Sequence, residues 1–181
     1  MWAQEIYTKA YRFAAEAHLG QTVPGTEISY IMHLSFVCME VMAALANEPN
    51  QDENLAIQCA LLHDTIEDTA VSFQQLEATF GTPVAHGVLA LTKNKTLPKT
   101  EQMTDSLARI QTQPHEIWLV KLADRITNLA PPPPHWTTHK MKQYREEAIA
   151  IHDALHPASP YLAKRLQQKI AKYKTYYKAN N

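Results

Sequence analysis

The sequence predicts an all-α fold, and two features of the chain lead to this prediction. Long segments carry apolar residues at the three- and four-residue spacing of a buried helix face. Only four glycines occur among the 181 residues, which leaves few positions for hairpin turns. A chain of this length with 45% hydrophobic residues buries one substantial core, so we expect residues 1–181 to form a single domain.

The first helix is expected over residues 2–19, where the apolar positions follow a helical period and Gly20 is a suitable C-cap. After a loop, a second helix is expected over 33–46. A third helix begins near residues 51–53 and continues through Asp68. Its sequence, LAIQCALLHDTIED, is apolar on nearly all sides, so we expect it to be the central and most buried helix.

The second half of the chain is also predicted to be helical. Ser72 followed by Gln75 predicts a capping box for a short helix that Gly81 ends. The prolines at 131–134 cannot lie inside a helix, and we interpret this short run as a stiff connector. The other expected helices cover residues 83–91, 99–111, 114–129, 138–155 and 159–178.

Composition limits the kinds of partner. A formal net charge of −1 provides no basic field for nucleic acid, which favours a small molecule as the ligand. No segment approaches the roughly 20 apolar residues of a membrane span, and the N-terminal residues lack the pattern of a signal peptide. Cys38 and Cys59 lie in apolar runs and are expected to be reduced packing residues. We therefore expect a cytoplasmic protein, and its oligomeric state stays open.

The segment ALLHDTIEDT places four ionisable residues in a helix that is otherwise suited to the interior. Their spacing forms two pairs four residues apart, His63 with Glu67 and Asp64 with Asp68, which predicts one polar wall of a pocket. The alternative is a solvated surface with an ion pair within the helix. That alternative suits one such residue better than four, because burying unpaired ionisable groups is unfavourable.

Two further segments carry similar signals. In KLADRITNL, Asp124 and Asn128 are again four residues apart on a mostly apolar helix. Taken alone, Asp124 could equally form a surface ion pair with Lys121 or Arg125. His33 follows Tyr-Ile-Met near the start of the second helix, where a lone histidine usually has no special role.

Together these segments supply two imidazoles and two carboxylates from three helices. Such a mixed nitrogen and oxygen set leaves room for water and a phosphate oxygen, and suits Mn²⁺, Fe²⁺ or another divalent first-row ion better than a closed zinc site. The predicted metal ligands are His33, His63, Asp64 and Asp124. The remaining histidines, which lack this convergence and are interpreted as ordinary, are His18, His86, His115, His135, His139, His152 and His156.

These residues match the H…HD…D signature of the HD phosphohydrolase superfamily. Over about residues 3–147 the chain more narrowly resembles the hydrolase domain of RelA/SpoT homologues, and its size resembles their stand-alone small alarmone hydrolases. The matching segments are AHLGQ (17–21), YIMH (30–33), ALLHDTIEDT (60–69), FG (80–81), LTKNKTLPK (91–99) and KLADRITNL (121–129). The resemblance implies an HD-type helical bundle, completed by helices at 138–178.

The resemblance also implies an activity: Mn²⁺-dependent removal of the 3′-pyrophosphate of (p)ppGpp, giving GDP or GTP and pyrophosphate, with no organic cofactor. By the same resemblance, Glu67 and Asp68 position and deprotonate the attacking water. Asn128 and Thr92 contact the sugar and phosphates, and Tyr144 faces the nucleoside.

The chain departs from the family pattern at two places. Leu34 stands where proline usually follows the YI-x-H segment, a structurally mild change. The loop at 22–27, which commonly carries an Arg/Lys pair for the base and 5′-phosphates, has no cation here. Charge could come instead from Lys93, Lys95, Lys99 or Lys140. The alternatives are therefore another substrate, such as (p)ppApp or a 2′- or 3′-phosphorylated dinucleotide, and a non-catalytic nucleotide-sensing module.

Overall fold

The computed structural model describes residues 1–178, and in this part of the chain every regular element is a helix. The α-helices are α1 Gln4–Ala17, α2 Ile31–Leu45, α3 Glu53–Leu62, α4 Thr65–Asp68, α5 Phe73–Phe80, α6 Thr82–Leu91, α7 Lys99–Gln111, α8 His115–Asn128, α9 Thr138–Leu155 and α10 Pro160–Lys178, with a 3₁₀ turn η1 at His156–Ala158. The pairing of Thr22 with Ser29 is an isolated bridge in a loop. The all-α prediction is confirmed.

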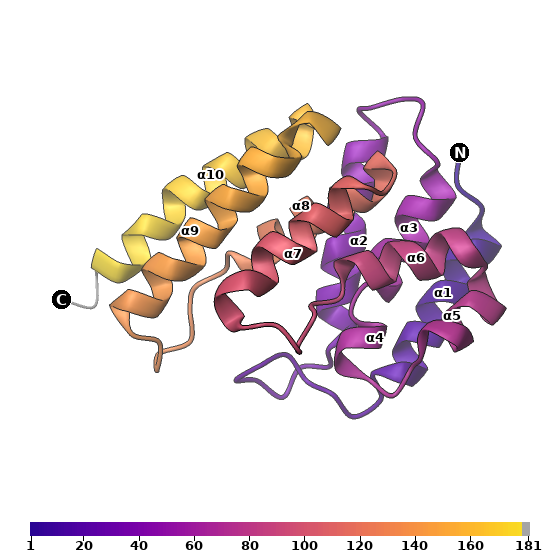
Figure 1. Ribbon diagram of the computed structural model, residues 1–181, viewed down its shortest axis with the longest axis horizontal. Helices are drawn as coiled ribbons and strands as arrows, with labels where there is room; N and C mark the ends of the chain where they lie inside the picture. The colour runs from indigo at the N-terminus through magenta and orange to yellow at the C-terminus, as the bar shows by residue number, and fades with distance from the viewer. Residues whose placement is uncertain (179–181) are drawn as a thin grey trace.

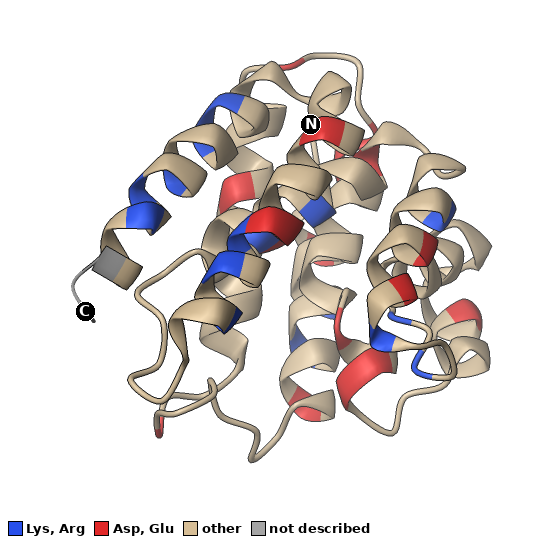
Figure 2. Ribbon diagram, turned by 60° about the vertical axis from the view of Figure 1, so that its left-hand side comes forward, with Lys and Arg blue, Asp and Glu red and all other residues tan. Residues whose placement is uncertain are grey.

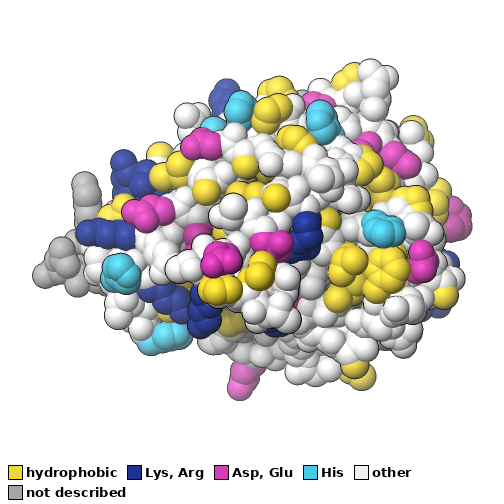
Figure 3. All heavy atoms as spheres, in the orientation of Figure 1, with side chains coloured by type: hydrophobic (Ala, Val, Ile, Leu, Met, Phe, Trp, Pro, Cys, Tyr) yellow, Lys and Arg dark blue, Asp and Glu magenta, His cyan; other side chains and the backbone are white. Residues whose placement is uncertain are grey.

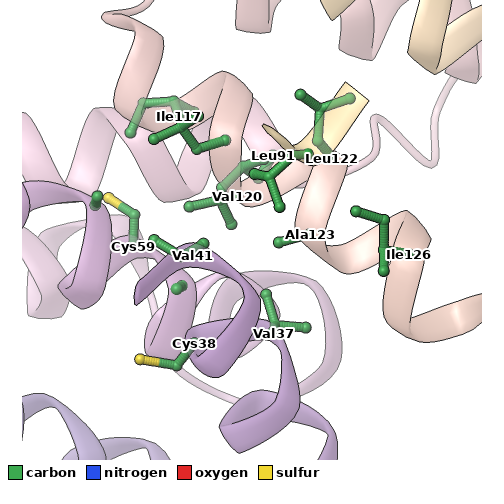
Figure 4. Close-up of a cluster of buried hydrophobic side chains, with 14 of the residues drawn as sticks. Val37, Cys38, Val41, Cys59, Leu91, Ile117, Val120, Leu122, Ala123 and Ile126 are labelled. Atoms are coloured by element: carbon green, nitrogen blue, oxygen red, sulfur yellow. The ribbon is translucent and has the colours of Figure 1, made fainter. Parts of the chain in front are cut away.

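Helix α8 lies at the centre of the bundle (Figure 1). It packs against α2, α3, α6, α7, α9 and α10, whereas α3 packs against α1, α2, α6 and α8. Figure 4 shows apolar side chains of α2, α3 and α8 facing one another, among them Val41, Cys59 and Val120. The predicted central helix α3 therefore shares the centre of the core with α8. The sequence showed that α8 is mostly apolar but did not predict its central position.

The third helix is not continuous through Asp68, which corrects the sequence-based prediction. Helix α3 ends at Leu62, and α4 begins at Thr65. The side-chain hydroxyl of Thr65 donates to the carbonyl oxygen of Leu62 at 2.6 Å, and His63 Nδ1 lies 2.9 Å from the carbonyl oxygen of Ala60. Such side-chain bonds compete with the helical backbone pattern. The break places His63 and Asp64 at a bend between two helices.

Several predicted helix ends are confirmed. Ser72 and Gln75 form the complete capping box of α5, and Gly81 follows its last residue with a φ of 85°. Helix α8 stops at Asn128, before the proline run. Helix α2 begins at Ile31, two residues earlier than expected.

A glycine inside α6 allows this helix to approach the core closely. A Cβ atom on Gly87 would lie 2.5 Å from Ile117 Cδ1 and 2.9 Å from Cys59 Sγ. Real side chains do not tolerate such distances, so α6 meets α3 and α8 only because this position has no side chain.

Both cysteines are free and buried, as predicted for packing residues. In Figure 4 both cysteines belong to the drawn cluster of buried side chains, and the sulfur of Cys38 points away from the other labelled residues. Burial raises the pKa of Cys38 to about 12, and burial with nearby carboxylates raises the pKa of Cys59 still further. These thiols therefore stay protonated near neutral pH.

Several connecting segments gather at one end of the bundle. The loop after α1, helix α4, the segment after α6 and the proline run all lie in the lower half of Figure 1. Lys and Arg are concentrated along α10, and the acidic residues lie elsewhere (Figure 2). The face in Figure 3 mixes charges of both signs with small hydrophobic groups. Among residues 1–178, no helix is long and apolar enough to cross a membrane.

Candidate metal centre and active site

The four predicted ligands come together from α2, the bend between α3 and α4, and α8. His33 Nε2 lies 3.6 Å from Asp64 Oδ2 and 3.5 Å from Asp124 Oδ1. His63 Nε2 lies 3.0 Å from Asp64 Oδ2 and 3.8 Å from Asp124 Oδ1. One donor atom each of His33, His63 and Asp64 lies within 4.8 Å of the other two. Apart from the contact between the adjacent residues His63 and Asp64, these contacts join residues 31 to 91 positions apart in sequence, so tertiary packing brings the three segments together.

The state of His63 shows that this cluster suits a cation. Its Nε2 atom is buried and makes no hydrogen bond, although Asp64 Oδ2 is only 3.0 Å away. Because a carbonyl oxygen only accepts, His63 Nδ1 must donate to Ala60, which aims the other ring nitrogen at the carboxylates. A buried imidazole nitrogen without a hydrogen-bond partner, next to two carboxylates, is compatible with the role of a metal ligand.

The electrostatics of the cluster favour positive charge. Burial lowers the pKa of His33, but hydrogen bonding with Asp124 and Asp64 outweighs burial and raises this pKa to about 9. Burial raises the pKa of Asp64, and the charge of His63 together with hydrogen bonds lowers it well below its usual value. Asp64 is therefore ionised, and the neighbouring histidines balance its negative charge.

Asp64 is supported by a stack of side chains that the sequence did not single out as functional. The hydroxyl of Tyr30 donates to Asp64 Oδ2 at 2.6 Å. The Tyr30 ring stacks on His18 with centroids 5.0 Å apart, and His18 Nδ1 lies 2.7 Å from Gln21 Oε1. His18, interpreted from sequence as ordinary, is only 3% exposed. The signal was present in the AHLGQ and YIMH segments, which contain these residues.

Asp124 has its own partners on α8. Lys121 Nζ lies 3.5 Å from Asp124 Oδ2, and Asn128 Nδ2 donates to Asp124 Oδ1. The ion pair with Lys121 was one of the alternatives for this segment, but it is buried and belongs to the cluster rather than to the surface. Burial raises the pKa of Asp124, and Lys121 and the histidines lower it to well below its usual value.

A polar cavity of about 120 Å³ adjoins the cluster, and Glu67 and Asp68 line it together with His63, Asp64 and Asp124. The backbone N–H of Lys93 donates to Glu67 Oε2 at 2.9 Å, and Lys93 Nζ lies 3.4 Å from Glu67 Oε1. Burial and the charges of Asp64 and Glu67 raise the pKa of Asp68. The cavity thus contains carboxylates, which can accept protons, and the cationic side chains of Lys93 and Lys121, which can bind anionic oxygens.

A second cavity, of about 410 Å³, opens on the other side of His33 and Asn128. Its remaining walls are mostly apolar: Val23, Pro24, Met32, Phe36, Thr127, Ala130, Pro131, Pro132, Pro133, Trp136, Tyr144 and Tyr173. The buried guanidinium of Arg125 lies 4.2 Å from the centroid of the Tyr144 ring and 3.5 Å from Glu147. We call this cavity the aromatic pocket.

The predicted substrate-binding residues are placed differently with respect to the two cavities. Asn128 lines both, and Tyr144 lines the aromatic pocket. Lys140 is exposed, with Nζ 4.3 Å from the centroid of the Trp136 ring. The hydroxyl of Thr92 donates to the carbonyl oxygen of Val88 at the end of α6, so it caps the helix, while the neighbouring Lys93 lines the polar cavity.

Comparisons with known proteins agree with this geometry. A family model described as HD domain matches residues 10–159. The chain is 33% identical over 168 residues to guanosine-3′,5′-bis(diphosphate) 3′-pyrophosphohydrolase MESH1 of Danio rerio, covering 90% of this chain and 91% of that protein. It is 32% identical to MESH1 of Homo sapiens, covering 88% of this chain and 89% of the relative.

The fold matches a solved structure of a metazoan ortholog of SpoT that hydrolyses ppGpp, with a TM-score of 0.81 and 26% identity. The match covers 95% of this chain and 97% of that structure. The chain therefore belongs to the HD-domain family, within the RelA/SpoT-type group that contains these MESH1 proteins.

Proposed function

We propose that this chain is a metal-dependent phosphohydrolase that removes the 3′-pyrophosphate of guanosine alarmones, converting (p)ppGpp to GDP or GTP and pyrophosphate. The convergence of His33, His63, Asp64 and Asp124 beside a cavity lined by carboxylates and lysines carries this proposal. The relatives named for this reaction match nearly the whole chain, which supports the same conclusion.

The proposed resident metal is Mn²⁺, held by two imidazoles and two carboxylates. This donor set suits divalent first-row ions, and the unpaired Nε2 of His63 fits the role of a ligand. When bound, such an ion lowers the pKa of a water molecule and polarises a phosphoryl oxygen.

The other residues of the polar cavity then have distinct roles. Glu67 and Asp68 orient the attacking water and accept its proton. The raised pKa of Asp68 makes this carboxylate a stronger base than an ordinary aspartate. Lys93 and Lys121 lie where the departing pyrophosphate needs positive charge, in the same cavity.

Substrate binding is proposed to span both cavities. Asn128 stands between them, where it contacts the ribose and the 3′-phosphates. Tyr144 faces the nucleoside in the aromatic pocket, and Lys140 supplies charge near its wall. The hydroxyl of Thr92 caps α6 and so is not available to the substrate. Thr92 therefore contributes indirectly, by ending α6 where the next residue, Lys93, lines the polar cavity.

Two broader expectations accompany this function. We infer that the chain works as one domain, since a single cluster of buried residues joins α1 to α10 in the described part. A cytoplasmic location and a small nucleotide as the partner stay predictions from sequence.

The test is hydrolysis of ppGpp with added Mn²⁺, with the products separated by chromatography. Release of pyrophosphate and GDP is expected. His63→Ala should abolish metal binding and turnover together, because it removes a ligand, and the surface variant His139→Ala is the matched control. A folded, metal-loaded protein that leaves ppGpp intact would refute the proposal.

A further inference from the structure

The charged residues of helix α10 are all cationic. Its 19 residues include six of the 17 Lys and Arg residues of the chain and none of the 18 Asp and Glu residues. Figure 2 shows Lys and Arg along the helix that leads to the C-terminus. The net charge of −1 therefore averages a basic helix with an acidic remainder, and this average does not exclude a local surface for a polyanion.

Three of these cations lie on one stripe of the helix. Arg165, Lys169 and Lys172 are spaced four and three residues apart, which places them on the same helical face. Together with Gln168 they line a hollow of about 190 Å³, and among the described residues no carboxylate lines it. All four side chains carry N–H donors, so the hollow suits anionic oxygens. We call these four residues the basic hollow.

Contacts within the chain orient one member of the basic hollow and leave two others uncompensated. Arg165 donates from Nε to Oε2 of the buried Glu40 at 2.6 Å and from Nη2 to its Oε1. This two-point contact fixes the plane of the guanidinium and leaves Nη1 outside the pair. No carboxylate of residues 1–178 pairs with Lys169 or Lys172, whereas both lysines of the polar cavity have such partners. Lys169 and Lys172 therefore supply net positive charge.

The same stripe ends at an aromatic side chain. Tyr176 follows Lys172 by four residues and is half-buried, so part of its ring is accessible. Its ring meets that of the buried Tyr173 edge to face, with centroids 5.4 Å apart and planes at 87°. A row of cations that follows a phosphate backbone, next to a ring on which a base stacks, is the combination that binds single-stranded nucleic acid.

The opposite face of α10 argues against a membrane as the partner. Leu162, Leu166 and Ile170 belong to the hydrophobic core, where α10 packs against α8 and α9. A helix that lies in a membrane interface needs its apolar face free to enter the lipid, and here that face is occupied. An acidic peptide would use the cations but not the ring of Tyr176. A nucleic-acid strand uses both.

We propose that the basic hollow and Tyr176 form a binding surface for single-stranded nucleic acid, with phosphates at the hollow and a base stacked on the ring. The stripe from Arg165 to Tyr176 is about 17 Å long at the rise of an α-helix, so it suits a strand rather than a single phosphate. The hollow shares no residue with the polar cavity or the aromatic pocket. Binding at this surface is therefore independent of the proposed hydrolase activity.

The first experiment measures binding of a fluorescein-labelled oligouridine by fluorescence anisotropy at low salt. With about three phosphate contacts, the logarithm of the association constant should fall with the logarithm of the salt concentration at a slope of about −2. Lys169→Gln/Lys172→Gln should weaken binding at least about tenfold and bring the slope to about −0.7. The control Lys142→Gln/Lys174→Gln removes two exposed charges outside the hollow and should change the affinity much less.

The second experiment tests the stacked base. Tyr176→Ala should weaken binding of the oligouridine by about 5- to 150-fold, the usual effect of removing a stacking ring. Tyr176→Phe keeps the ring and should recover most of the affinity, which separates stacking from a loss of packing against Tyr173. A duplex of the same length should bind more weakly than the single strand, because paired bases are not free to stack on the protein.

The outcomes separate this inference from the proposed function. His63→Ala should bind the oligouridine like the wild type, and Lys169→Gln/Lys172→Gln should hydrolyse ppGpp at the wild-type rate. No binding of the oligouridine at low salt, or equal binding by the hollow variant and the wild type, would overturn the inference. Binding to vesicles that contain phosphatidylserine, or to polyglutamate, without binding to the oligouridine would overturn it as well and assign the surface to a membrane or to an acidic protein.

Discussion

The hydroxyl of Tyr30 and the carboxylate of Asp64 are joined by a hydrogen bond of 2.6 Å, which connects the loop before α2 to the bend between α3 and α4. Burial, together with the charge of Asp64, raises the pKa of Tyr30 above its usual value, so the phenol remains a donor. Partners of this kind fix the orientation of a ligating carboxylate.

Tyr30→Phe should weaken metal binding by about 10- to 100-fold, the usual effect of removing a partner of a ligand. The phenyl ring retains the contact with His18, so the fold should be unaffected. Titration calorimetry with Mn²⁺ measures the change, and Tyr11→Phe, on α1 outside the cluster, is the control. Equal affinities for the variant and the wild type would mean that Asp64 needs no such support.

Glu67→Gln should lower kcat by about 10²- to 10⁴-fold, because the amide cannot take a proton from the attacking water. The metal content, measured by elemental analysis, should stay the same as in the wild type, since Glu67 is proposed as a base and not as a ligand. Glu146→Gln, an exposed change on α9, is the matched control. Loss of the metal in Glu67→Gln would instead make Glu67 a ligand.

The sequence predicted most of the helices because apolar periodicity is a strong local pattern. It predicted the four converging residues only when three segments, each ambiguous alone, were taken together as one set of metal ligands. It did not predict the break at His63 and Asp64, which depends on side-chain bonds to Ala60 and Leu62 that compete with a good helical pattern. Local periodicity contains no information about such competition.

The cysteines provide a test of burial. Neither should react with a thiol reagent at pH 8 in the folded protein, because burial raises the pKa of Cys38 to about 12 and that of Cys59 further. In denaturant, two thiols per chain should react with Ellman's reagent. Rapid labelling of the native protein would show that the core opens easily.

Gly87→Ala should reduce the free energy of unfolding by about 1–3 kcal/mol, the usual effect of overpacking. The new methyl group would lie 2.5 Å from Ile117 Cδ1, and this clash outweighs the higher helix propensity of alanine. Urea denaturation measures the difference. Leu89→Ala, a 40% exposed position on the same helix, is the control and should change the stability much less.

The aromatic pocket could not be predicted from sequence, because its walls come from distant segments. Val23, Phe36, Trp136 and Tyr173 belong to four different parts of the chain, and none has a periodicity that links it to the others. The resemblance identified Tyr144 but not Trp136, which follows the proline run. Only packing shows that these residues surround one cavity.

The last prediction concerns the loop at 22–27, which has no cation. Its backbone is fixed near the aromatic pocket, because Thr22 pairs with Ser29, and the N–H of Val23 donates to the carbonyl oxygen of Ile28 at 2.8 Å. Val23 lines the pocket. A cation introduced here would therefore lie within reach of a bound nucleotide.

The double change Thr22→Arg/Val23→Lys should lower KM for ppGpp by an order of magnitude or more, since each charge-assisted hydrogen bond contributes about 1.5–3 kcal/mol. The gain should shrink as salt is added, because exposed charges are screened. The metal and the carboxylates are unchanged, so kcat should be preserved. Ile28→Lys adds a charge directly after this loop, at a residue that does not line the pocket, and should give little of this gain. An unchanged KM in the double variant would contradict this prediction and show that charge at residues 22 and 23 does not reach the bound nucleotide.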